Sequence, residues 1–336
     1  MKFTSLLASS LLFLLAVFVA CGPSNSNHYL NNRIELEAIA LMMDHDLEVL
    51  EDEITKLGEF TTGLFDNKEE VLSKADKNKY VIKGVGANAG ILVDTSLSSL
   101  YIPEIDQDKQ AVDELIYLTN PLDSLFKSIV EKHKVVSQVY FNSSTQLNRL
   151  FPPYDVYNML EPDLDLTTFN FYYEADEKNN PSRGLVWVDE IYIDPVGRGW
   201  MISLLNPVYH YDNLKMVLAF DITVNDIFES YIEKSNKELI VVDATGTVVA
   251  GKSKAIEVLS LPPLKNYTYK QTITSDSFRM EDFNLFKSKN IEVRKTASNI
   301  ILAGERESVL NSEGEKIIVI SEKLERLNWY ILELVL

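Results

Sequence analysis

The sequence predicts an α+β protein, in which one long N-terminal helix precedes two modules that are each built on a central antiparallel sheet with flanking helices. Apolar residues recur at helical spacing over 36–57. Short apolar runs separated by turn residues then recur over 135–222, and a second set of this kind follows over 239–335. Without its leader the chain has roughly 315 residues, which is enough for two cores of ordinary domain size.

Residues 1–20 are predicted to be a secretion signal. Lys2 precedes the apolar run Leu6–Val19, which is too short to span a bilayer comfortably and ends at a cleavage-like site. Cys21 follows and is the only cysteine of the chain. This end resembles the signal of bacterial lipoproteins, which implies cleavage before Cys21 and lipidation of its thiol. An ordinary signal peptide with an incidental cysteine is the alternative.

The resemblance places the mature chain in the bacterial cell envelope, lipid-anchored on the extracytoplasmic side, in the periplasm or at the outer membrane. Composition limits its other partners. With 32 basic and 50 acidic residues the formal net charge is −18, so the chain lacks the positive field that nucleic acids or an anionic membrane surface would require. A single cysteine leaves none for disulfides or for a thiolate metal site.

A polar tether is expected over 21–30 and a long helix over 31–65. The helix is predicted from one apolar stripe that alternates steps of four and three residues, formed by Leu36, Ala40, Met43, Leu47, Leu50, Ile54 and Leu57. The stripe fits two arrangements. It could be the seam of a coiled-coil homodimer, or the helix could pack lengthwise on its own modules.

The first module is expected over 66–234. It is predicted to contain a helix, a hairpin, an excursion over 155–183, three successive antiparallel strands and a closing helix, at Pro121–Lys134, Val135–Pro153, Leu185–Asp194, Asn206–Tyr209, Leu214–Ile222 and Asn225–Lys234. The second, smaller module is expected over 235–336. Its predicted parts are a hairpin and three further strands, at Leu239–Ala250, Ile291–Ala303, Lys316–Glu322 and Trp329–Val335.

No motif of a hydrolase, transferase or nucleotide-binding enzyme is present, and we expect neither catalysis nor a cofactor. The triplet Asp44-His45-Asp46 has the residue types of a metal site. Adjacent helical residues point about 100° apart, however, and cannot share one ion. We therefore expect no metal there.

The three strands over 185–222, together with the phrase Leu327–Val335, resemble the double Cache (dCache, PAS-like) extracellular sensor domains of bacterial receptors. The resemblance implies a protein that binds a small molecule without changing it. Members that bind amino acids carry an Arg-x-Trp-Tyr pattern before the first of these strands. Here Asn170 stands at the arginine, Tyr172 replaces the tryptophan and Tyr173 matches the tyrosine.

Further along, Tyr192 and Asp221 match the family's ammonium-binding tyrosine and aspartate, and Asp189 and Asp194 match positions beside them. Trp187 offers an additional aromatic wall. A guanidinium binds a carboxylate through two charge-assisted bonds, which the Asn170 amide cannot do. The resemblance therefore implies a ligand that is an amine or another small polar metabolite. In the alternative reading, Trp187 and Tyr192 only pack the sheet.

In receptors of this family a membrane-spanning helix follows the last strand, whereas this sequence stops at Leu336. We expect a lipid-anchored, sensor-type binding protein that acts through a partner receptor, kinase or transporter. An interaction or structural lipoprotein that uses the Cache scaffold without a small ligand is the first alternative. A tethered enzyme is the second.

Overall fold

The computed structural model describes residues 25–105, 108–262, 280–312 and 314–336. The predictions for the signal at 1–20 and for lipidation of Cys21 lie outside these residues. Over the described ranges, no helix combines the length and the apolar character needed to cross a bilayer.

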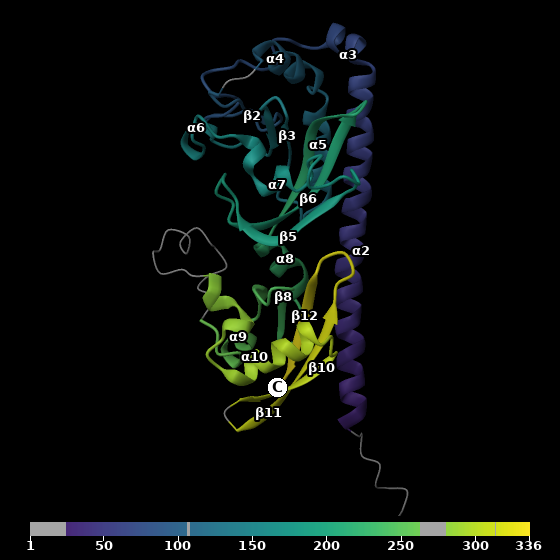
Figure 1. Ribbon diagram of the computed structural model, residues 1–336, viewed down its shortest axis with the longest axis vertical. Coiled ribbons are helices and arrows are strands. Elements are labelled where there is room, and N and C mark those ends of the chain that lie inside the picture. Colours follow the sequence, from purple (N-terminus) through teal and green to yellow (C-terminus); the bar gives the residue numbers. More distant parts are fainter. Residues whose placement is uncertain (1–24, 106–107, 263–279, 313) are drawn as a thin grey trace, which may run out of the picture.

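One helix, α2 (Asn25–Asp66), runs the length of the molecule, and both modules lie along it (Figure 1). The helix begins inside the segment expected to be a tether, so that prediction is wrong from Asn25 onward. Asn and Ser are well tolerated in the first turn of a helix, so a polar composition did not distinguish helix from tether.

The apolar stripe of α2 is buried by the chain itself. Its members, from Leu36 to Leu57, are between 0 % and 6 % exposed and belong to one core that continues from the first module into the second, where it includes Trp329. Of the two arrangements left open by the sequence, lengthwise packing on the modules is therefore the one observed. The stripe is not a seam between two copies.

The first module contains a seven-stranded antiparallel sheet with strand order β1-β2-β4-β3-β7-β6-β5. The strands are β1 (Gly86–Ala87), β2 (Ser99–Tyr101), β3 (Gln138–Ser143), β4 (Asn148–Phe151), β5 (Val186–Ile193), β6 (Trp200–His210) and β7 (Asn213–Thr223). Its helices are α3 (Lys68–Lys74), α4 (Lys109–Leu118), α5 (Leu122–Lys132), α6 (Val156–Met159), α7 (Asn170–Tyr173) and α8 (Val224–Ile227).

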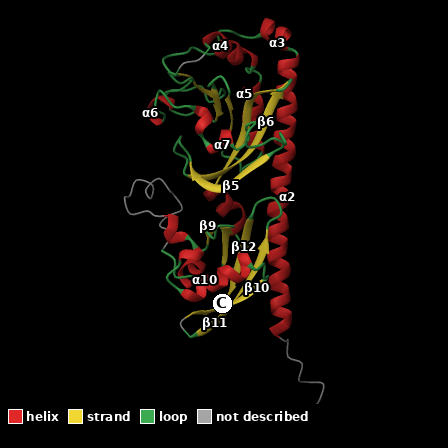
Figure 2. Ribbon diagram, viewed as in Figure 1, coloured by secondary structure: helices red, strands yellow, loops and turns green. Residues whose placement is uncertain are grey.

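The two faces of this sheet belong to different cores. In β7, Leu218 and Phe220 join the core along α2, while Val217 and Ala219 face a second core with Phe171 and the other residues between β4 and β5. Side chains alternate across a strand, so Asp221 falls on the face of the second core. Figure 2 shows the short helices α6 and α7 set apart from α2 by the sheet.

The second module contains a five-stranded antiparallel sheet with order β10-β11-β12-β8-β9. Its strands are β8 (Leu239–Asp243), β9 (Val248–Gly251), β10 (Glu307–Ser312), β11 (Glu315–Lys323) and β12 (Trp329–Val335), and its helices are α9 (Ser253–Val258) and α10 (Ile291–Ala297). The predicted class, a long helix followed by two modules with antiparallel sheets, is confirmed.

One predicted strand of this module is wrong. Residues 291–303 form α10 followed by a π-helical turn, Ser298–Leu302. Val293, Ala297 and Ile300 are buried at spacings of four and three, which is the period of a helix. Asn290 caps the helix by accepting a hydrogen bond from the N–H of Glu292.

A carboxylate of α2 fixes the turn between β11 and β12. Asp44 is 6 % exposed and accepts hydrogen bonds from the backbone N–H groups of Glu325, at 3.0 and 3.1 Å, and of Arg326, at 3.1 Å. Its neighbours in the sequence have other partners: His45 lies 3.9 Å from Glu48, and Asp46 accepts a bond from the Tyr231 hydroxyl. The triplet thus points in three directions.

We predict that Asp44→Ala lowers the free energy of unfolding by about 1–3 kcal/mol, because it leaves two partly buried N–H groups without an acceptor. His45→Ala is the matched control on the next residue, whose side chain is 71 % exposed, and it should change stability by less than about 0.5 kcal/mol. Urea unfolding followed by circular dichroism measures both. Equal effects of the two substitutions would contradict the assigned role.

Candidate functional site

Asp221 lies at the centre of the first sheet, on β7 between β3 and β6. Its Cα partners across the ladders are Gln138 on β3 and Ser203 on β6. Directly opposed residues on adjacent antiparallel strands have their side chains in contact, and diagonal neighbours two residues away are within reach of long side chains. The fold therefore brings Gln138, Ser203 and the diagonal Tyr140 to the carboxylate.

All three donate hydrogen bonds to Asp221. Gln138 Nε2 lies 2.5 Å from Oδ2, and Ser203 Oγ and the Tyr140 hydroxyl lie 2.5 and 3.1 Å from Oδ1. The Tyr192 hydroxyl completes the group, 2.5 Å from Ser203 Oγ and 3.5 Å from Asp221 Oδ1. Asp221 is 1 % exposed, so these donors replace the water that a carboxylate ordinarily binds.

Burial and, to a smaller extent, repulsion from Asp194 raise the pKa of Asp221 to about 7, although the hydrogen bonds from Gln138, Ser203 and Tyr140 oppose the rise. Burial likewise raises the pKa of Asp194, against the backbone N–H bonds of Val196 and Arg198 that stabilise its ionised form. Because the two buried carboxylates repel each other when both are ionised, a state in which the pair holds one proton is favoured. The site is therefore poised to exchange a proton near neutral pH.

These carboxylates line a small cavity of about 40 Å³. The sheet contributes Gln138, Tyr140, Asn142 and Asn148, the turn after β5 contributes Asp194 to Val196, and the outer wall consists of Leu160, Leu164, Leu166, Phe169 and Phe171. The Phe171 ring stacks on Phe169 and meets the Tyr140 ring edge to face, with centroids 4.9 and 5.9 Å apart. Among the described side chains that line the cavity, none is basic.

Arg198 lies close to this cavity, and burial lowers its pKa. Its guanidinium donates to the backbone carbonyls of Ser137 and Pro152, at 3.1 and 3.3 Å. It thus fixes the strand ends around Asp194, and both of its terminal nitrogens already have acceptors.

The structure gathers some of the predicted site residues and separates others. Asp221 and Asp194 line the cavity, whereas Tyr192 does not line it and bonds to Ser203, a donor to Asp221. Tyr172 is buried in the same core but does not line the cavity. Tyr173 is 41 % exposed, and Asn170 accepts a hydrogen bond from the N–H of Phe171.

Trp187 and Asp189 lie on the opposite face of β5, so their expected place in the pocket is wrong. The Trp187 ring N–H donates to Glu51 of α2 at 2.8 Å. Asp189 accepts bonds from the second module, through its carboxylate from the N–H of Asn328 and through its carbonyl from the ring of Trp329. Strand alternation explains this, because Val188 and Tyr192 pack in the core of the cavity, whereas Trp187 and Ile191 pack in the core along α2.

Gln138, Tyr140 and Ser203 were missed by sequence reasoning. A signal for the first two was present, since Gln138 and Tyr140 stand two residues apart among apolar neighbours on a strand. Ser203 sits in the apolar run Met201–Leu205 and carries no such signal. In the described part of the chain, no group of three or more His, Cys, Asp or Glu residues is placed to bind a metal ion.

No protein-family model and no curated protein matches the chain. Among solved structures, the sensory domain of the Campylobacter jejuni chemoreceptor Tlp3 (CcmL) is 13 % identical with a TM-score of 0.48, covering 92 % of this chain and 95 % of that one. The ligand-binding domain of the Pseudomonas aeruginosa PAO1 amino acid chemoreceptor PctC, in complex with GABA, is 15 % identical with a TM-score of 0.48, covering 92 % and 99 %.

The extracellular domain of the putative histidine kinase soHK1S-Z6 is 13 % identical with a TM-score of 0.45, and covers 92 % of this chain and 96 % of that one. Each of these alignments covers nearly the whole of a sensory domain, but the sequence identity is very low. The element order and the two sheets, described above, are those expected from the sequence resemblance. The chain has the architecture predicted from its sequence, a long helix followed by two modules that are each built on an antiparallel sheet.

We predict a characteristic pH dependence of stability. The pKa of Asp221 in the folded state, about 7, lies above the ordinary 3.8 of the unfolded chain. The folded protein therefore binds this proton more tightly, and the free energy of unfolding falls as pH rises from about 4 to about 7, by a few kcal/mol from this group. Asp221→Asn should flatten that fall.

Urea unfolding at pH 5, 6, 7 and 8 measures this effect as the difference between wild type and Asp221→Asn. Asp212→Asn, at a side chain that is 94 % exposed, is the control and should follow the wild type. A difference between Asp221→Asn and wild type that does not change with pH contradicts the assignment.

Proposed function

We propose that this protein is a lipid-anchored, extracytoplasmic, sensor-type protein that binds a small amine, or a similar cationic metabolite, at the Asp221 cavity. The observation that carries the proposal is the pair of carboxylates, Asp221 and Asp194, in a cavity with no basic residue among its described lining. An ammonium group would place a positive charge inside the cavity, beside the two carboxylates and in addition to the Arg198 guanidinium behind them. Its arrival would also lower the pKa of Asp221 and ionise it.

The rest of the lining suits such a ligand. Tyr140, Tyr154 and Phe171 line the cavity, and a cation held over the face of an aromatic ring gains roughly 0.5–2 kcal/mol. Gln138 Oε1 and Asn142 Nδ2 are buried lining atoms that have no hydrogen-bond partner among the described residues. Buried polar atoms are ordinarily paired, so one acceptor and one donor remain for a ligand.

A free α-amino acid fits this cavity less well. Its carboxylate would face Asp221 and Asp194, Asn170 does not line the cavity, and the guanidinium of Arg198 is bonded to backbone carbonyls. We therefore favour ligands without a carboxylate next to the ammonium group.

The observed volume, about 40 Å³, is close to the ~30 Å³ that one water molecule occupies. Binding of a metabolite therefore requires the cavity to open. The outer wall belongs to residues 160–171, where the regular structure is only a 3₁₀ turn at Leu166–Thr168 and the four-residue α7. We infer that this segment moves outward, because the opposite wall is the hydrogen-bonded sheet.

The same small volume favours the alternative function, a scaffold lipoprotein whose Cache module is closed and binds partners without a small ligand. The two functions differ in a simple measurement. A binding protein gains about 2.7 kcal/mol of stability when a ligand is present at a hundredfold excess over its dissociation constant, and a closed scaffold gains nothing from any small molecule.

Anchoring and assembly are part of the proposal. Lipidation of Cys21 would place the start of α2, and with it the second module, next to the membrane, while the Asp221 cavity lies in the remote module (Figure 1). Leu30, Ile34 and Leu41 of α2 are 56 %, 56 % and 60 % exposed. Spaced by four and seven residues, they form a second apolar stripe that suits a homodimer or the partner receptor, kinase or transporter.

We predict that linear amines, such as butylamine and putrescine, raise the melting temperature of the mature protein, and that Asp221→Asn abolishes the shift. Asn170→Ala should leave binding unchanged, because that side chain does not line the cavity. Affinity for the amine should rise between pH 6 and pH 8 as Asp221 ionises. Thermal-shift assays followed by calorimetric titration provide these measurements.

Glycine, alanine and isoleucine serve as amino acid probes in the same assay. Binding of amino acids that depends on Asn170, without binding of amines, contradicts the proposed ligand class. A broad metabolite panel that produces no stabilisation supports the scaffold function instead, and chemical conversion of any bound compound would indicate an enzyme.

A further inference from the structure

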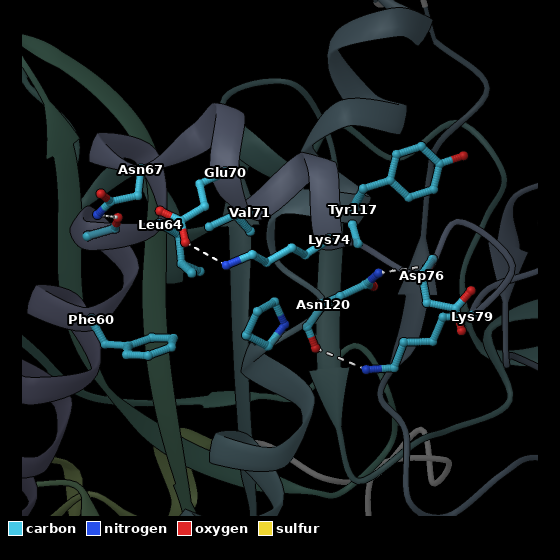
Figure 3. Close-up of a pocket in the computed structure, with 13 residues that line it drawn as sticks. Phe60, Leu64, Asn67, Glu70, Val71, Lys74, Asp76, Lys79, Tyr117 and Asn120 are labelled. Atoms are coloured by element: carbon cyan, nitrogen blue, oxygen red, sulfur yellow. Dashed lines mark hydrogen bonds and ion pairs between the residues drawn. The ribbon is translucent and has the colours of Figure 1, made fainter.

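A second pocket lies at the end of the first module that is remote from the second module. This distal pocket has a volume of about 700 Å³ and is formed by the end of α2, by α3, by the loop after α3 and by the junction of α4 and α5. Ligand sites in proteins commonly enclose about 300–1,000 Å³. Figure 3 shows its apolar side chains, among them Phe60, Leu64 and Val71, together with Lys74 and Lys79.

A largely buried ionic cluster with more positive than negative charges lies next to the pocket. Asp123 pairs with two cations, Arg149 Nη1 at 2.7 Å and Lys79 Nζ at 2.7 Å. Arg149 is 0 % exposed, and its other terminal nitrogen donates to the neutral carbonyl of Ile116 at 2.9 Å. Two positive charges thus share one carboxylate.

The protonation states of Asp123 and Tyr80 at neutral pH preserve this excess of positive charge. Burial alone would raise the pKa of Asp123, but Arg149 and Lys79 hold it below its ordinary value, so the carboxylate is ionised at neutral pH. The Tyr80 hydroxyl donates to Asp123 at 2.8 Å, and burial raises its pKa well above the ordinary range, so it contributes no negative charge. The cluster therefore carries a net charge of about +1 in a poorly solvated place.

Lys79 brings that charge to the pocket. Its ammonium group forms an ion pair with Asp123 and donates a hydrogen bond to the carbonyl of Asn120 at 3.0 Å, and an ammonium has three N–H groups. The side chain is 25 % exposed and lines the pocket. One donor thus remains for a group bound there.

A second cation is available at the mouth. Lys74 pairs with Glu70 at 2.6 Å, but the two side chains are 72 % and 65 % exposed, and exposed pairs of this kind contribute little free energy. In Figure 3 the Lys74 side chain lies across the pocket, between Glu70 and Asn120. A bound anion could therefore exchange for Glu70 at low cost.

We propose that the distal pocket binds an organic anion with an apolar body, such as an aryl- or alkyl-carboxylate. The carboxylate lies against Lys79 and Lys74, and the apolar body packs on Phe60, Leu64, Val71 and Pro121. This site is separate from the Asp221 cavity, and its ligand has the opposite charge, so either proposal can fail while the other stands.

The test is calorimetric titration of the full mature protein with 3-phenylpropionate, compared with 3-phenylpropionamide and 3-phenylpropylamine. We expect one saturable site for the carboxylate, with affinity at least about tenfold above that for the amide, because a charge-assisted hydrogen bond is lost. Asp221→Asn should leave this binding unchanged. Equal affinity for the carboxylate and the amide overturns the proposal.

Gly63 offers a matched pair of variants to locate the site. It lines the pocket from within α2, and a Cβ atom built on it meets nothing within 4 Å. Gly63→Ala should fold normally and retain binding, whereas Gly63→Phe should fill the open space and abolish it. Unaltered titration of Gly63→Phe overturns the proposed location.

Charge removal tests the two lysines. Lys74→Met should weaken binding of 3-phenylpropionate severalfold without loss of stability, because its only recorded pair is exposed. Lys79→Met should weaken it further, by about tenfold or more. Lys79 also forms an ion pair with Asp123, so Lys79→Met could weaken binding by disturbing the fold. Lys74→Met and Gly63→Phe are therefore the deciding variants. If both retain full binding of 3-phenylpropionate, the site is rejected.

Discussion

Burial of a single stripe on α2 is the constraint on which the architecture depends. Seven apolar side chains on one helix face, from Leu36 to Leu57, serve both modules, and the core they form continues from one sheet to the other. Neither sheet could cover its helix-facing side without this helix, because an exposed apolar face of that size is costly in water. The modules are therefore held in one line, and each keeps its second face for a separate core.

Strand alternation then decides which residues meet. On β7, Phe220 enters the shared core and Asp221 enters the other, where cross-strand neighbours surround it with hydroxyl and amide donors. A carboxylate held in this way remains close to its protonation midpoint, because desolvation and the hydrogen bonds act in opposite directions.

The sequence predicted the fold class because helical and strand periods are both local signals. It placed Asp221 and Asp194 through a family resemblance, but it assigned Trp187 and Asp189 to the wrong face, although their odd spacing from Tyr192 was visible. Gln138 and Ser203 depend on register between distant strands, which no local pattern specifies. Over 291–297 the sequence predicts a strand where the structure has a helix, because the apolar residues fit either period over a short run.

Strand β5 has a consequence for how the two halves of the molecule communicate. Its cavity face carries Tyr192, and its other face carries Asp189, whose backbone and carboxylate hold the tip of the β11–β12 turn. An irregularity in the ladder lies between Val188 and Tyr192, where a strand twists most easily. The strand is thus a shared wall: one face packs on the core of the Asp221 cavity, the other bonds the hairpin tip of the neighbouring module, and a shift of the strand would move both.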